Sequence, residues 1–140
     1  MEYVVNSLKQ TASLANKFAK TLAGGEKILL NGDLGAGKTT FTKFLAKAMG
    51  VKDEVTSPTF TILKEYQGKR FKLYHFDMYR LSGGAEATGF GFEDYLSDDE
   101  NNSVVVIEWS EMVKDILKGD FITINISRIN DTTRKIEILR

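Results

Sequence analysis

GDLGAGKT, residues 32–39, matches the pattern Gly-x-x-x-x-Gly-Lys-Ser/Thr at every fixed position. The apolar stretch KILLNG, residues 27–32, leads into it, and TTFTKFLAKAMG, residues 39–50, follows with a helical pattern. Glycines let the backbone bend so that successive N–H groups point inward, and the start of a helix adds the positive end of its dipole. Strand, glycine-rich turn and helix in this order predict a loop that binds the phosphates of a nucleoside triphosphate.

The last residues of this loop carry its chemistry. Lys38 is expected to reach the β- and γ-phosphates, and the hydroxyl of Thr39 is placed to ligate Mg²⁺. The alternative interpretation is an ordinary glycine turn between a strand and a helix. The apolar strand before the loop and the helical pattern after it favour the phosphate site, because that site requires both.

The composition is that of one water-soluble domain. The chain has 140 residues, 42% of them hydrophobic, and a single proline, so we expect one domain over residues 1–140. It has no cysteine, its beginning lacks the features of a secretion signal, and no apolar run approaches the roughly 20 residues that span a bilayer. We therefore expect a cytoplasmic protein that contacts no membrane. Nineteen basic residues balance nineteen acidic ones, which gives no support for a nucleic-acid-binding patch.

The other segments predict a mixed sheet. A capping-box pattern begins at Ser7, and the helix behind it is expected to stop before Gly24. Residues 60–66 and 70–77 predict a hairpin turned at Gly68. Further predicted elements are strands at 104–109, 121–126 and 135–139, a short helix at 111–117 and one or two helical turns near 92–96. Together they predict an α/β fold of the P-loop NTPase type, with a parallel core, antiparallel hairpin strands and flanking helices.

A nucleotide site of this kind requires an acidic residue near the magnesium ion, and the sequence offers two candidates. Glu108 ends the strand VVVIE, and Asp77 ends LYHFD. If the second strand stays extended, His75, Asp77 and Tyr79 share one side. The structural alternatives are a His75–Asp77 hydrogen bond that only fixes the loop, and a solvated acid at position 108.

Trp109, the chain's one tryptophan, follows Glu108 directly. If the strand continues through it, its side chain points to the opposite face from Glu108. Such a tryptophan is most simply part of the core. The alternatives are packing against the nucleotide or against a partner surface.

Four segments in this order and spacing resemble the TsaE family, also called YjeE or YdiB: GDLGAGKTTF at 32–41, TSPTFT at 56–61, YHFDMYRL at 74–81 and IEWSE at 107–111. The resemblance extends from KQTASLA at the first predicted helix to TTRKIEIL at the last strand. Members are small bacterial ATPases needed to make threonylcarbamoyladenosine at position 37 of certain tRNAs. The resemblance therefore implies ATP and Mg²⁺ as cofactors.

The resemblance also implies roles for individual residues. Lys38, Asp77 and Glu108 form the expected catalytic set, and Thr39 and Glu108 are the expected magnesium ligands. The residues expected to bind the nucleotide are Thr11, Gly35, Ala36, Gly37, Lys38, Thr39, Thr40, Trp109 and Arg134. TSPT at 56–59 resembles a switch-like loop beside the γ-phosphate. Two departures are Ser110, where many members have proline, and the glycine-rich segment 81–95.

The implied partners are the proteins TsaD and TsaB, and the tRNA would be acted on by their assembly rather than gripped by this chain. The alternative function is a small-molecule or nucleotide kinase with its own phosphoryl acceptor. Such kinases usually carry clustered lid arginines, whereas the arginines here are scattered. A GTP-driven switch is a third alternative, and INDTT at 129–133 does not fit the acid motif that recognises guanine.

Overall fold

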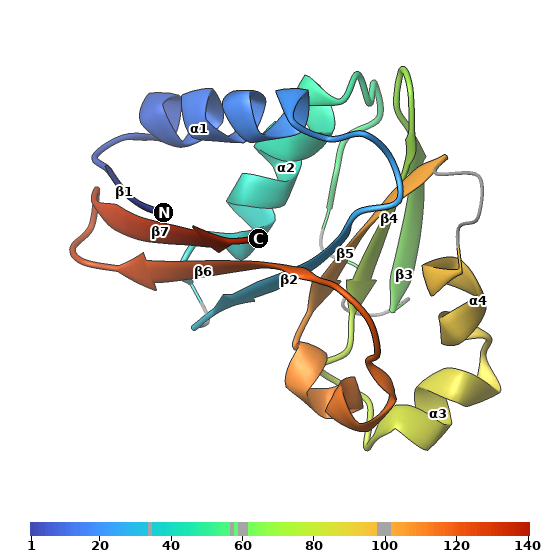
Figure 1. Ribbon diagram of the computed structural model, residues 1–140. Coiled ribbons are helices and arrows are strands. Elements are labelled where there is room, and N and C mark those ends of the chain that lie inside the picture. The colour runs from blue at the N-terminus through green and yellow to red at the C-terminus, as the bar shows by residue number, and fades with distance from the viewer. Residues whose placement is uncertain (34, 57, 59–61, 98–101) are drawn as a thin grey trace.

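The computed structural model describes residues 1–33, 35–56, 58, 62–97 and 102–140. A seven-stranded sheet forms the middle layer of the fold (Figure 1). Its strand order is β1-β7-β6-β2-β5-β4-β3. The strands are β1 (Glu2–Val5), β2 (Lys27–Gly32), β3 (Leu63–Gln67), β4 (Lys72–Asp77), β5 (Ser103–Glu108), β6 (Ile122–Arg128) and β7 (Arg134–Leu139).

The middle of the sheet is parallel and its edges are antiparallel. Strand β2 pairs in parallel with β5 and β6, and β5 pairs in parallel with β4. The hairpin β3–β4, the hairpin β6–β7 and the pair β1–β7 are antiparallel. Every residue of β5 is buried, as expected for a parallel strand covered on both faces. The predicted fold class is confirmed.

Helices cover both faces of this sheet (Figure 1). Helices α1 (Leu8–Lys20) and α2 (Lys38–Ala48) lie on one face, where Phe18 and Phe41 enter a core with Val106. The short helices α3 (Gly84–Gly89) and α4 (Phe92–Leu96) and the 3-10 helix η1 (Ser110–Ile116) lie on the other face. There Phe76 and Phe92 meet edge to face, with 4.9 Å between ring centroids. No helix in the described ranges has the length and apolar character needed to cross a membrane.

Helix α1 begins where the capping pattern predicts. The Ser7 hydroxyl accepts a hydrogen bond from the backbone N–H of Gln10 at 3.2 Å. The Gln10 side chain accepts in turn from the N–H of Asn6, one residue before the position that the capping box specifies. The helix ends at Lys20, ahead of Gly24, which has a left-handed φ of 99°.

The hairpin predicted around Gly68 is present as β3 and β4, with β3 beginning at Leu63. Residues 60 and 61, which the prediction also assigned to this strand, lie outside the described part of the chain. Strand β1 was not predicted, because four residues give too short a pattern to read. It is held by pairing with β7 and by the terminal amine, which donates to the carbonyl of Ile138 at 2.9 Å.

Two predicted elements around Trp109 differ in detail. Strand β5 ends at Glu108, because Trp109 takes a left-handed conformation with a φ of 57°. The short helix predicted over 111–117 is the 3-10 helix η1, which begins at Ser110. Helix α3 was not predicted. At its start the backbone N–H and the hydroxyl of Ser82 donate to Glu86, and these bonds lower the pKa of that carboxyl.

Candidate functional site

The glycine-rich loop, residues 32–39, joins the carboxyl end of β2 to the start of α2, and Leu34 within it lies outside the described residues. A Cβ on Gly32 would come within 2.7 Å of the carbonyl oxygen of Ile126 on β6, so only glycine fits there. Gly35 and Gly37 have φ values of 80° and 108°, which side chains rarely tolerate. The loop is therefore shaped by glycine at three positions.

The start of α2 is suited to an anion. Gly37 caps the helix without a side-chain hydrogen bond, and no acidic residue occupies the first turn. The first N–H groups of a helix have no partner inside it, and the helix dipole makes this end positive. A Cβ added to Gly35 would meet nothing within 4 Å, so the loop faces open space at that point. A phosphate group fits these donors and this opening.

Lys38 opens α2 and is buried, with 7% of its surface exposed. Its Nζ lies 4.0 Å from Oε1 of Glu108 and 4.3 Å from the ring centroid of Trp109. A buried ammonium group is costly unless it is paired, and the carboxylate and the indole face both attract it. Two of the three predicted catalytic residues are thus in contact.

Glu108 is buried at the carboxyl end of β5, which contradicts the alternative of a solvated acid at this position. Its second carboxylate oxygen, Oε2, lies 2.5 Å from Nε2 of His75, a fully buried residue on β4. The alternative of a His75–Asp77 hydrogen bond is therefore wrong. The reason is the strand order: β4 lies beside β5 in parallel, which brings His75 to the acid of the neighbouring strand.

Asp77 is the last residue of β4 and lies opposite Glu108 in the strand register. It is buried, and its Oδ1 accepts a hydrogen bond from the backbone N–H of Tyr79 at 3.0 Å. The strand does not continue to Tyr79, so that residue does not share its face as an extended strand would require. The Tyr79 side chain is instead exposed and packs on Trp109, with 4.8 Å between ring centroids.

The sequence predicts a hydroxyl and a carboxylate, from Thr39 and Glu108, as the protein donors for a magnesium ion. Thr39 lies in the first turn of α2, directly after Lys38, whose ammonium group is paired with Glu108. Among the described residues, no three His, Asp, Glu or Cys side chains gather to hold a metal ion by themselves. Mg²⁺ usually takes one or two protein oxygens and fills its other positions with phosphate oxygens and waters. Thr39 and Glu108 fit that donor set.

A cleft of about 650 Å³ adjoins the loop, within the range of small-molecule sites. It lies between the start of α1, the loop and the β6–β7 turn. Five of the predicted nucleotide-binding residues line it: Thr11, Ala36, Gly37, Thr40 and Arg134. Trp109 is absent from its lining, so the structure places that residue over Lys38 and not along the cleft. Sequence reasoning missed the cleft residues Asn6, Asp131 and Thr132, which have no distinctive motif.

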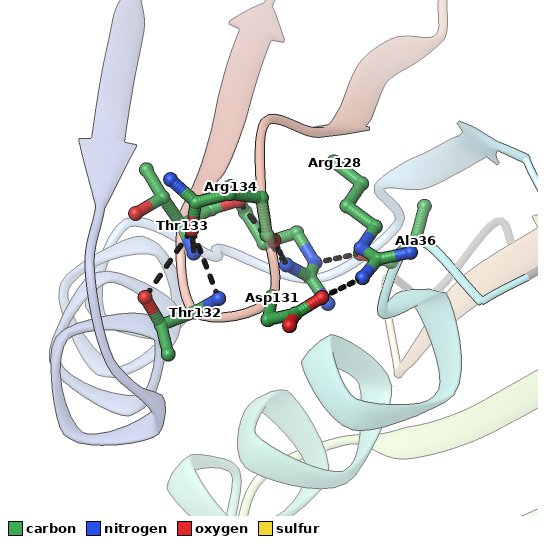
Figure 2. A network of polar contacts seen from close by, with 7 residues as sticks. Ala36, Arg128, Asp131, Thr132, Thr133 and Arg134 are labelled. Carbon is green, nitrogen blue, oxygen red and sulfur yellow. Dashed lines mark hydrogen bonds and ion pairs between the residues drawn. The ribbon is translucent and has the colours of Figure 1, made fainter.

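Arg134 fastens the β6–β7 turn to the glycine-rich loop (Figure 2). Its Nε donates to the carbonyl of Ala36 at 2.9 Å, and its Nη1 donates to the carbonyls of Asn130 and Thr133 at 2.7 and 3.1 Å. Arg128 on the same hairpin forms a separate, exposed ion pair with Asp131. Arg134 therefore shapes the wall of the cleft through backbone carbonyls.

The structure divides the predicted residues into two neighbouring groups. Lys38, Glu108 and Trp109 are in contact at the head of α2, and Thr11 and Arg134 belong to the cleft. For His75, the sequence suggested Asp77 as an alternative partner, and the structure gives Glu108 instead. Half of the predicted switch-like loop at 56–59 lies outside the described residues, which include Thr56 and Pro58 but not positions 57 and 59.

Comparison with known proteins gives consistent results. The family model described as "Threonylcarbamoyl adenosine biosynthesis protein TsaE" matches residues 5–136. The protein named tRNA threonylcarbamoyladenosine biosynthesis protein TsaE in Rickettsia prowazekii is 38% identical over 133 residues, which cover 94% of this chain and 90% of that protein. The protein of the same name in Bacillus subtilis is 40% identical over 128 residues, covering 91% and 76%. A crystal structure of Bacillus subtilis YdiB matches with a TM-score of 0.80 and 33% identity, covering 97% of this chain and 82% of that one.

Proposed function

The chain belongs to the TsaE family of threonylcarbamoyl adenosine biosynthesis proteins, and from that premise we propose that it is a P-loop ATPase that binds MgATP and drives the tRNA threonylcarbamoyladenosine modification cycle. The observation that carries the proposal is the contact between Lys38 and Glu108 at the head of α2. Through this contact, a lysine that can bind phosphate and an acid that can bind magnesium lie together beside the glycine-rich loop.

In the proposed complex, the glycine-rich loop binds the phosphates of ATP and the cleft binds its adenosine. The N–H groups at the start of α2 and the ammonium of Lys38 hold the phosphates, since both offer positive charge at one end of the loop. The adenosine lies along the adjoining cleft, bounded by Thr11, Thr40 and Arg134. Arg134 keeps the cleft in shape through its bond to Ala36.

The catalytic residues act on the γ-phosphate and on water. Thr39 and Glu108 would hold Mg²⁺, which neutralises phosphate charge as the bond to the leaving group breaks. The ammonium group of Lys38 would stabilise the same charge. Asp77, one strand further along the sheet from Glu108, orients the attacking water. Its buried position favours this role, because a carboxylate shielded from solvent interacts more strongly with a polar partner.

The partners we propose are TsaD and TsaB, with the chain turning over ATP slowly alone and faster in their complex. The open space at Gly35 supports this view, because phosphoryl transfer depends on positioning and on charge placed against the transferred group. A protein docked over that opening would exclude water and complete the site. The tRNA would then be bound by the assembly and not by this chain, whose net charge is zero.

ATP turnover by the chain alone, by the TsaD–TsaB complex alone and by the two together tests the proposal. We expect turnover above the sum of the two parts, and no gain when Lys38→Ala replaces the parent. Additive turnover would contradict partner stimulation. The alternative function is a small-molecule or nucleotide kinase, and transfer of labelled phosphate from ATP to an added acceptor by the chain alone would favour it.

A second experiment tests the coupling between nucleotide and docking. We expect the chain to bind the TsaD–TsaB complex with different affinities in ADP and in a non-hydrolysable ATP analogue, because a nucleotide shifts an equilibrium only by its differential affinity for the two states. Calorimetric titration measures both affinities. Equal values, without stimulated turnover, would overturn the coupled cycle while leaving ATP binding intact.

A further inference from the structure

His75 is the chain's one histidine, and it is completely buried on β4. Its Nε2 lies 2.5 Å from Oε2 of Glu108, much closer than the 4.0 Å between Glu108 and Lys38. Oε1 of Glu108 lies on the Lys38 side, 4.0 Å from its ammonium nitrogen. The two oxygens of one carboxylate therefore have separate partners.

The other ring nitrogen of His75 indicates which way this hydrogen bond runs. Nδ1 is buried, and in the described structure it has no hydrogen-bond partner. A buried N–H without an acceptor is rarer in proteins than a buried acceptor without a donor. The proton therefore belongs on Nε2, which donates to Oε2, and Nδ1 keeps its lone pair. Within the described part of the chain, the His75 ring therefore has Glu108 as its one hydrogen-bond partner.

An apolar side chain would suit this position on β4 better if packing were its only role. The neighbours on the same face of the two strands are Leu73 and Val106, both fully or almost fully buried in the core beneath α2. Burying a polar ring here is unfavourable, and the single hydrogen bond to Glu108 offsets only part of that cost. The ring's contribution lies in what it does to the carboxylate.

We propose that His75 is a positioning residue for the magnesium-side acid. It holds Oε2 of Glu108 and so keeps Oε1 turned toward Lys38 and the first turn of α2, where the ion would be bound. A free glutamate side chain loses rotamer entropy when it is fixed, and the histidine fixes it in advance. This inference rests on the proposed MgATP function and deepens it, because it names the group that orients a ligand of the ion.

Two substitutions separate positioning from packing. In His75→Gln the side-chain amide nitrogen reaches about as far as Nε2 and can donate to Oε2. In His75→Asn it reaches only as far as Nδ1 and cannot. Both variants bury a side-chain amide in the core, so the cost of burying a polar group is similar in the two. Phe76→Leu serves as a control for lost packing, because Phe76 points to the opposite face and contacts Phe92.

The readout is the Mg²⁺ concentration that gives half of the gain in ATP affinity, measured by calorimetry at constant pH. Partners that orient a metal ligand typically change metal affinity by about 10–100-fold. We expect His75→Asn to raise this concentration by about 10-fold or more, and His75→Gln to restore most of the loss. ATP affinity in EDTA should be the same in both variants, and Phe76→Leu should lower only the melting temperature.

A double-mutant cycle and a spectrum complete the test. In a Glu108→Gln background, His75→Asn should have no further effect on the magnesium dependence, since its target is gone. Long-range ¹H–¹⁵N spectra of the parent should show the Nε2-protonated tautomer for the single histidine. Magnesium dependence equal to the parent's in His75→Asn, or a ring with a proton on Nδ1 and none on Nε2, would overturn the positioning role. If Mg²⁺ does not change the ATP affinity of the parent protein, the proposed function is wrong, and the inference about His75 is wrong with it.

Discussion

The Nζ of Lys38 lies 4.0 Å from Oε1 of Glu108, so the cation and the acid of the candidate site neutralise each other at the head of α2. ATP phosphates must compete with Glu108 for this ammonium group unless a second cation satisfies the acid. Mg²⁺ does so in the proposed site, which leaves the ammonium group of Lys38 available to the phosphates.

Glu108→Gln follows from this relationship. We expect the variant to bind Mg²⁺-free ATP at least as tightly as the parent, because Lys38 no longer faces a negative charge. The gain in affinity from Mg²⁺ should fall by at least about 1.4 kcal/mol, a factor of ten. Titration of ATP in EDTA and in Mg²⁺ measures both quantities. A full magnesium gain in Glu108→Gln would remove Glu108 from the ion's ligands.

Asp77→Asn should separate binding from hydrolysis. The new amide oxygen can still accept the hydrogen bond from the N–H of Tyr79, so the fold should survive. We expect the turnover of bound ATP to fall by about 100-fold, within the range for a residue that handles the reacting water, while the affinity for MgATP stays close to the parent's. Single-turnover kinetics and calorimetry provide the two measurements. Parent-like turnover would mean that Asp77 only closes the end of β4.

Arg134→Ala should loosen the cleft. It removes three hydrogen bonds to backbone carbonyls, including the one to Ala36, and we expect a loss of about 1–3 kcal/mol in the free energy of unfolding together with weaker ATP binding. Arg128→Ala is the matched control, since it removes an arginine from the same hairpin but breaks only an exposed ion pair, worth about 0–1 kcal/mol. Urea denaturation compares the two. Equal losses would show that the Arg134 contacts add nothing.

Gly32→Ala tests the close approach of the glycine-rich loop to β6. The added Cβ would sit 2.7 Å from the carbonyl oxygen of Ile126, so the backbone has to shift, at a cost of about 1–3 kcal/mol. Gly83→Ala is the control, because a Cβ there meets nothing within 4 Å and the backbone is extended. A thermal melt of each variant decides. If Gly32→Ala melts with the parent, this loop does not depend on glycine at position 32.

Local patterns predicted the segments whose structure is set by near neighbours. The loop at 32–39 with its strand and helix, and the hairpin at Gly68, follow from residues close together in the chain. The partner of His75 could not be predicted, because it depends on β4 lying beside β5, two strands joined by a long connection. The left-handed turn at Trp109 was missed for a different reason: the residue is not a glycine, so the sequence carries no local signal for a positive φ.

In the glycine-rich region that begins at residue 81, one or two helical turns were predicted near residues 92–96, and the structure has two short helices, α3 and α4. Gly84 explains part of its composition. A Cβ at this position would lie 2.5 Å from Oδ1 of Asp115 on η1, and the N–H of Gly84 donates to that same oxygen at 3.2 Å. Gly84 thus allows a close approach to an element far along the chain, which sequence patterns near residue 84 do not show.

The most direct test of the account is the effect of MgATP on the melting temperature of the parent, Lys38→Ala and Lys43→Ala. Lys43 lies on the exposed side of the same helix and controls for the loss of a lysine. A ligand at roughly 100 times its Kd stabilises by about 2.7 kcal/mol, on the order of 10 °C for a domain of this size. We predict that shift in the parent and in Lys43→Ala, and its loss in Lys38→Ala. No shift in the parent, or an equal shift in Lys38→Ala, would contradict the nucleotide site.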